Sequence, residues 1–155
     1  MASKAGEHSE IKAIDLSSGQ IRIAKKKNLL PNIEFLVMDA SETCFAEAYF
    51  DRVVIPHALH EMPGGVRMAV LKEAGRIVKD GGTLAVFEMD TPPNLFWHLC
   101  IGFWWFYWLP FNPETRTRRD MLKHGLAGEI KEAGFRYVRK ISMCHGTLQV
   151  VKGQK

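Results

Sequence analysis

The chain has 155 residues, of which 46% are hydrophobic and 25% are charged, and its formal net charge at pH 7 is +4. That length is enough for one domain with a buried core, and the composition excludes a disordered or fibrous protein. The Lys and Arg residues are scattered along the chain, so charge alone gives no argument for nucleic acid as a partner.

The cysteines are three in number and widely spaced, at Cys44, Cys100 and Cys144. They form neither a disulfide framework nor a Cys-x-x-Cys metal motif, which favours a reducing compartment. The first residues are polar and do not resemble a secretion signal. The sequence therefore predicts a cytoplasmic location.

The first half of the chain alternates apolar runs with a helical stretch. Ser17, followed three residues later by Gln20, is typical of a helix start, and Lys25–Lys27 suits a helix C-terminus. The apolar runs predict strands at Ile11–Ile14, Ile33–Asp39 and Arg52–Ile55.

The second half continues the same alternation. A helix is predicted after Pro63, with Val66, Val70, Ala74 and Ile77 on one face, and Lys79–Gly82 is expected to end it with glycine at its C-terminus. The other predicted elements are a strand at Thr83–Asp90, a helix at Met121–Ala133 closed by Gly134, and an antiparallel pair at Phe135–Ile141 and Thr147–Val151.

Strands without polar alternation, separated by helices, predict a parallel sheet covered on both faces and thus an α/β fold. No repeat or linker interrupts it, so residues 1–155 are predicted to form a single domain. Ligands of open α/β sheets bind at the carboxyl ends of the strands. Those ends are predicted at Asp15, Asp39, Pro56–His57 and Glu88–Asp90, and the successive acids suggest an adenosine site.

Several stretches occur in the order and spacing of class I S-adenosylmethionine (SAM)-dependent methyltransferases. They read IDLSSGQIRIAKKKN, NIEFLVMDASETCF, FDRVVIPHALHEMP, LKEAGRIVKDGGTLAVFE and, at the end, EAGFRYVRKISMCHGTLQVVKG. The chain most resembles the ubiquinone/menaquinone-biosynthesis group (methyltransferase type 11). The resemblance covers about residues 5–152. It implies a Rossmann-like sheet, SAM as cofactor and a small, apolar methyl acceptor, quinone- or lipid-like.

The resemblance also implies roles for individual residues. Asp15 matches the acid that binds the ribose, with Leu16 against the adenine, and Asp39 with Ala40 matches the pair that reads the adenine edge. His57 follows the strand near which the family places the methionine part of the cofactor and the acceptor.

A general base is harder to assign, because methyl transfer from a sulfonium relies largely on positioning. His57, His60 or Glu61 could act as a base towards a hydroxyl or enol; alternatively, His60 caps the next helix and faces solvent. Many relatives have two histidines where this chain has His60–Glu61. His98, His124 and His145 lack ligand-like spacing, so no metal site is predicted.

The family's glycine-rich turn, which follows a first strand, is expected about 20–30 residues before Asp15. Residues 1–10 are polar, and their Ala-Ser-Lys-Ala-Gly run resembles the end of the family's first helix, so we expect an N-terminally truncated domain that lacks the central strand. The unpaired neighbouring strands would then favour dimerisation, strand exchange or a strand from another polypeptide.

Leu95–Phe111 contains all four tryptophans and allows three interpretations. The first interpretation is a buried helix with core aromatics, the second is an apolar lid over the acceptor, and the third is a peripheral membrane contact. The nearby Arg116, Arg118 and Arg119 suit the membrane contact, could bind an anionic group of the acceptor, or simply begin a solvated helix.

Two alternatives to an active methyltransferase remain. The first is a non-catalytic fragment or subunit with the methyltransferase fold, which needs an N-terminal part or a partner chain to bind cofactor. The second is a nicotinamide-dependent oxidoreductase, which the antiparallel tail and the ALHEMP stretch disfavour.

Overall fold

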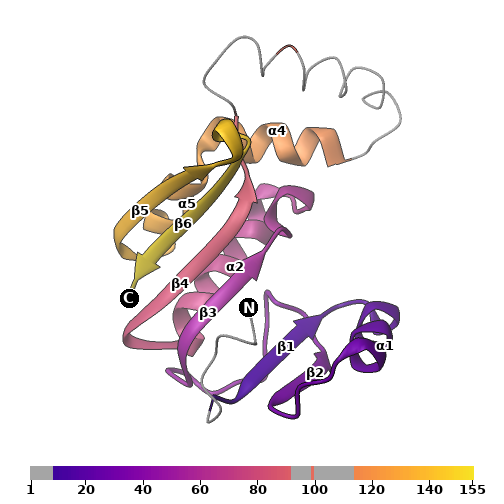
Figure 1. Cartoon of the computed structure of the whole chain (residues 1–155). Coiled ribbons are helices and arrows are strands. Elements are labelled where there is room, and N and C mark those ends of the chain that lie inside the picture. Colours follow the sequence, from indigo (N-terminus) through magenta and orange to yellow (C-terminus); the bar gives the residue numbers. More distant parts are fainter. Residues whose placement is uncertain (1–8, 92–98, 100–113) are drawn as a thin grey trace. The chain divides into compact units, whose positions relative to one another are not determined.

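The computed structural model describes residues 9–91, 99 and 114–155, and the chain divides into two compact units, Met1–Thr43 and Cys44–Lys155 (Figure 1). The described strands form one two-stranded and one four-stranded sheet. The predicted α/β class is confirmed. A single domain that is incomplete at its N-terminus stays a prediction.

The first unit contains β1 (Ile11–Asp15), α1 (Ser18–Lys27) and β2 (Ile33–Val37). The two strands are parallel, with Asp15 opposite Val37, so both end at the same edge of their sheet. The Ser17 hydroxyl accepts the Gln20 N–H at 3.3 Å, which is the cap predicted for α1.

The second unit contains a four-stranded sheet in the order β3-β4-β6-β5. The β3–β4 pair is parallel, whereas β4–β6 and β6–β5 are antiparallel, which confirms the predicted antiparallel ending. The elements in chain order are β3 (Phe50–Pro56), the 3-10 helix η2 (Leu59–Glu61), α2 (Gly64–Ile77), β4 (Val78–Met89), α4 (Glu114–His124), α5 (Leu126–Glu132), β5 (Arg136–Met143), the 3-10 helix η4 (Cys144–Gly146) and β6 (Leu148–Gln154).

The core of this unit lies between the sheet and its helices. Helix α2 packs against β4, α5 packs against β5 and β6, and the two helices contact each other, so they cover the same face (Figure 1). Several side chains of the sheet and the helices are completely buried there, among them Leu71, Leu84, Val86, Ile130 and Val151. This packing fixes the strand ends that carry the candidate site.

Three local predictions are wrong. Helix α2 ends at Ile77, and Lys79–Gly82 lies within β4 instead of forming a glycine cap. Val66 is 46% exposed rather than on the buried face of α2. The predicted helix over residues 121–133 is two helices, because Gly125 has a φ of +81° and separates α4 from α5.

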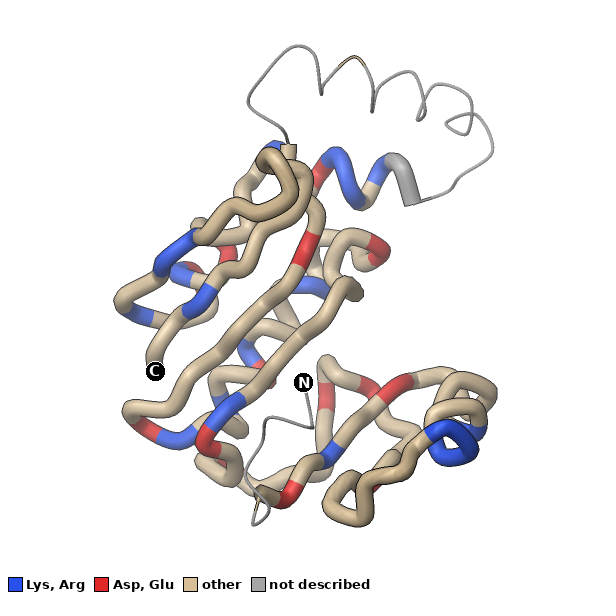
Figure 2. The backbone as a smooth tube through the Cα atoms, viewed as in Figure 1, with Lys and Arg blue, Asp and Glu red and all other residues tan. Residues whose placement is uncertain are grey.

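Figure 2 shows Lys and Arg distributed over both units, with clusters in the last turn of α1 and on α4. The aromatic segment Leu95–Phe111 lies outside the described residues except for Leu99, so its three interpretations stay open. Among the helices that the structure describes, none is both long and apolar enough to cross a membrane.

Candidate functional site: two strand edges

The carboxyl edge of the first unit brings four predicted site residues together. Asp15 ends β1, and Asp39 follows β2 in the neighbouring position of the sheet. The Met38 N–H donates to the Asp15 carbonyl oxygen at 3.1 Å, which ties the two strand ends together. Leu16 and Ala40 follow the two acids, and Leu16 is 71% exposed.

Each of these acids has one carboxylate oxygen anchored by nearby hydrogen-bond donors. Asp15 Oδ1 accepts the Ser17 N–H at 2.7 Å, and Asp39 Oδ1 accepts both the N–H and the hydroxyl of Ser41. Within the part of the chain that the structure describes, no donor reaches either Oδ2 atom. The hydrogen bonds from Ser41 lower the pKa of Asp39, which keeps that carboxylate charged. Two anchored carboxylates beside an exposed leucine fit the hydroxyls and the flat ring of an adenosine.

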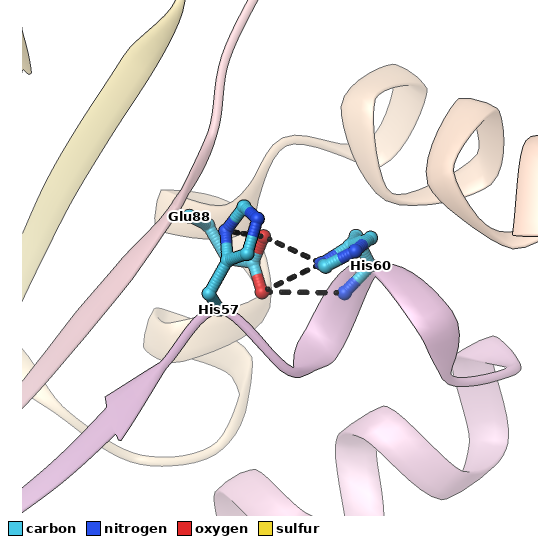
Figure 3. Close-up of side chains that lie close together, drawn as sticks. All are labelled: His57, His60 and Glu88. Atoms are coloured by element: carbon cyan, nitrogen blue, oxygen red, sulfur yellow. Dashed lines mark hydrogen bonds and ion pairs between the residues drawn. The ribbon is translucent and has the colours of Figure 1, made fainter.

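The second unit has its own polar cluster, at the carboxyl ends of β3 and β4. It consists of His57, which follows β3, His60 of η2 and Glu88 near the end of β4 (Figure 3). The His57 N–H donates to the Phe87 carbonyl oxygen at 2.7 Å, so this residue continues the β3–β4 pairing. The structure thus brings the two histidines of the sequence prediction together with an acid from the next strand.

Glu88 is the centre of this cluster. Its side chain is completely buried. Oε1 accepts the backbone N–H groups of Leu59 at 2.8 Å and of His60 at 3.3 Å, and Oε2 accepts that of Met89 at 3.0 Å. His60 Nδ1 lies 3.0 Å from Oε2. A buried carboxylate with this many donors is held in one orientation and, in turn, fixes the η2 turn.

His60 is 3% exposed, so the alternative in which it caps α2 and faces solvent is wrong. The cap of α2 is Pro63, with no side-chain hydrogen bond. The hydrogen bond to Glu88 raises the pKa of His60, against the effects of burial and of the Arg118 charge on α4. Burial alone would raise the pKa of Glu88, but the hydrogen bond and charge of His60 outweigh it, so that pKa is lowered.

His57 differs from His60 in being accessible: its side chain is 44% exposed. Its Nδ1 lies 3.8 Å from Glu88 Oε2, and its ring centroid lies 4.6 Å from that of His60. Its backbone has a φ of +55°, a left-handed conformation that is unfavourable for a residue with a Cβ atom.

This backbone conformation gives a direct test. We expect the His57→Gly variant to be more stable than His57→Ala by about 0.5–1 kcal/mol, because only glycine avoids the left-handed penalty while both variants lose the imidazole. Urea denaturation of the two variants measures the difference. An alanine variant as stable as the glycine variant would contradict the observed φ.

Helix α2 also anchors the turn that follows the cluster. Arg67 is 1% exposed and donates to the Met62 carbonyl oxygen at 3.0 Å, next to η2. Its guanidinium also binds Glu129 of α5, at 2.6 Å and 2.5 Å, and Asp120 of α4 at 3.0 Å. One buried cation therefore connects three helices to the segment that carries His60.

The imidazoles of His57 and His60 and the carboxylate of Glu88 offer metal-ligand atoms within 4.8 Å of one another. The carboxylate oxygens already accept three backbone N–H groups and the His60 Nδ1–H. A metal ion would therefore have to displace the His60 hydrogen bond. The donor set is suitable for a divalent metal, but the hydrogen bonding of Glu88 disfavours one.

The sequence prediction missed Glu88 as a partner of the histidines and Arg67 as a buried cation. For Glu88 a signal was present. His57 and His60 follow one strand, and Glu88 stands at the end of the next, so the strand-end rule could have brought them together. For Arg67, no pattern in this sequence alone predicts that its side chain is buried.

Solved structures support the same fold. A SAM-dependent methyltransferase from Aquifex aeolicus superposes with a TM-score of 0.70 at 19% identity, covering 98% of this chain and 72% of the other. One from Methanosarcina mazei gives 0.63 at 21% identity, covering 100% and 86%. The fold is therefore the Rossmann-like one of SAM-dependent methyltransferases.

The sequence comparisons give the family. A protein-family model described as "Methyltransferase domain" matches residues 1–82 of this chain. An uncharacterized methyltransferase of Synechocystis is 28% identical over 146 residues, covering 91% of this chain and 64% of the relative. A demethylmenaquinone methyltransferase of Listeria monocytogenes is 29% identical over 164 residues, covering 94% and 68%. The chain belongs to the methyltransferase domain family of the class I SAM-dependent type, and it spans about two thirds of the length of these relatives.

Proposed function

We propose that this chain binds SAM and takes part in the transfer of its methyl group to a small, apolar, quinone-like acceptor. The observation that carries the proposal is the pair of anchored carboxylates, Asp15 and Asp39, at the same edge of a parallel strand pair in a chain of this family. Asp15 would accept hydrogen bonds from the ribose hydroxyls. Asp39 and Ala40 would read the adenine edge, and Leu16 would cover the ring.

The acceptor class is argued from a relative and from composition. The Listeria relative is named for demethylmenaquinone. The aromatic segment Leu95–Phe111 suits an apolar acceptor by its composition. His57 follows β3 and is the accessible imidazole of the second edge, so we assign it to the acceptor side of the reaction.

Titration calorimetry with S-adenosylhomocysteine tests cofactor binding. We expect the Asp15→Asn and Asp39→Asn variants to bind at least about tenfold more weakly, because each loses a charged hydrogen-bond acceptor. Glu34→Gln is the matched control: Glu34 is an exposed β2 acid near the other end of the strand and pairs with Lys12. The control is expected to bind like the wild type.

Two results would count against the proposal. If the wild type does not bind S-adenosylhomocysteine at millimolar concentration, the chain is not a cofactor-binding protein by itself, and the non-catalytic alternative is favoured. If the two Asp variants bind as tightly as the wild type, the adenosine site lies elsewhere. Methylation of a reduced short-chain demethylmenaquinone, followed with methyl-labelled SAM, then tests the acceptor.

A further inference from the structure

The orientation of His57 suggests how the acceptor is activated. Its Nδ1 faces the buried Glu88 carboxylate, 3.8 Å away, while the side chain is 44% exposed (Figure 3). Within the described residues no donor or acceptor reaches its Nε2, on the other side of the ring. The ring therefore has a carboxylate close to one nitrogen, at a distance longer than a hydrogen bond, and a second nitrogen that no described donor or acceptor contacts.

We propose that His57 and Glu88 form a catalytic dyad in which His57 Nε2 removes a proton from the acceptor, with Glu88 and His60 as positioning residues. This inference rests on the proposed methyl transfer. A carboxylate next to Nδ1 keeps the proton of the neutral imidazole on that nitrogen, which leaves the Nε2 lone pair as the base. Glu88 also stabilises the imidazolium that forms.

When the acceptor is a hydroxyl, His57 Nε2 takes the O–H proton, and the electron pair left on the acceptor becomes the nucleophile. Bound SAM supplies the methyl group: the new bond forms from the acceptor oxygen, or from a ring carbon conjugated with it, as the methyl–sulfur bond breaks and its electrons stay on sulfur. In the carbon case, the hydrogen of that carbon then moves to the oxygen. His57 releases one proton to solvent in either case.

The surroundings of Glu88 suit a positioning role. Leu59, His60 and Met89 hold its two oxygens by their backbone N–H groups, so the carboxylate cannot rotate away from His57. His60 Nδ1 lies 3.0 Å from Oε2, the same oxygen that His57 Nδ1 faces. The other charged groups near His60 are Glu61, 3.7 Å from its Nε2, and Arg118 of α4.

The first test does not depend on activity. The imidazole 15N spectrum of the full chain at high pH, where histidines are neutral, reports which ring nitrogen carries the proton. We expect His57 to carry it on Nδ1 in the wild type and to lose this preference in Glu88→Gln. A wild-type His57 that carries the proton on Nε2 would overturn the dyad, because the proposed base would have no free lone pair.

The second test measures turnover with reduced short-chain demethylmenaquinone as the probe. We expect His57→Asn to lower kcat about 10²–10⁴-fold, with S-adenosylhomocysteine affinity unchanged. Glu88→Gln should lower kcat and change its pH profile, and Glu88→Asp should restore part of it. His124→Asn is the matched control, since His124 is an exposed histidine on α4 that contacts Asp120. It is expected to keep full activity.

Three results of these measurements are distinguishable. A His57→Asn variant as active as the wild type overturns the dyad and leaves the proposed methyl transfer intact. A wild type that binds S-adenosylhomocysteine but does not methylate the probe contradicts the proposed acceptor, and the 15N spectrum then decides the dyad. Stoichiometric Zn²⁺ binding that is lost in His57→Asn and Glu88→Gln also overturns the dyad, because the side chains of His57, His60 and Glu88 would then be metal ligands.

Discussion

Replacing Arg67 with alanine is expected to lower the free energy of unfolding by about 3–5 kcal/mol, because it leaves buried charge without its partner. Arg67 is 1% exposed, and its guanidinium forms ion pairs with Glu129 of α5 and Asp120 of α4. It also holds the Met62 carbonyl oxygen beside η2. The Arg67 guanidinium lowers the pKa of Asp120, as expected for a pair that is charged in the folded protein. Urea denaturation measures the loss.

The matched control is Arg136→Ala. Arg136 is an exposed arginine at the start of β5, and its loss should leave the free energy of unfolding nearly unchanged. A second variant, Arg67→Lys, keeps the charge but cannot form the two-point contact with Glu129, so it should lie between wild type and alanine. If Arg67→Ala is no less stable than Arg136→Ala, the buried network does not support the helices as described.

Local sequence signals predicted most elements because each acts over a few residues. The Ser17–Gln20 pair marks the start of α1, and continuous apolar runs mark β1, β2 and β4. The antiparallel β5–β6 pair followed from two apolar segments joined by a turn near Gly146. The order of these elements then sufficed for the fold class, since strands separated by helices pair in parallel.

The wrong boundaries come from glycines whose role depends on tertiary contacts. Gly82 has the sequence of a helix stop but lies in β4, where a Cβ atom would come within 2.8 Å of the Lys79 carbonyl oxygen and 2.9 Å of that of Asp51. Its lack of a side chain thus serves the close approach of β3, which no local pattern reveals. Gly125 has a positive φ within an otherwise helical pattern, and the sequence alone did not distinguish a tolerated glycine from a break.

In the candidate site too, some features follow from local sequence signals and others depend on tertiary contacts. The position of Asp15 and Asp39 at one edge was predictable, because Asp15 ends one strand and Asp39 follows the next, and the strand-end rule brings them together. The distinction between His57 and His60 was not, because they differ by three positions in the sequence, yet one is 44% and the other 4% exposed in its side chain. Their partner also lies far away in the sequence: His60 hydrogen-bonds to the buried Glu88 carboxylate of another strand, whereas His57 Nδ1 lies 3.8 Å from it.

The His60–Glu88 pair gives the chain a pH-dependent stability. The pKa of His60 is raised in the folded protein, so its contribution is complete below the ordinary histidine pKa of about 6.5 and is lost as pH rises through the folded value. The pKa of Glu88 is lowered, so its contribution is present above about 4.5 and is lost as pH falls through the folded value. The pair should stabilise most between about pH 4.5 and 6.5.

A double-mutant cycle with Glu88→Ala, His60→Ala and the double variant isolates this interaction. Near pH 6 we expect Glu88→Ala to cost about 3–5 kcal/mol, because it leaves a buried imidazolium and the backbone N–H groups of η2 without an acceptor. The coupling energy between the two sites should fall as pH rises through the folded pKa of His60, so we expect it to be smaller at pH 9 than near pH 6. Denaturation curves of the four proteins at both pH values measure it. A coupling energy that is equal at pH 6 and pH 9 would mean that the two side chains interact without the His60 charge, and Glu88 would then act only as the acceptor for the backbone of η2.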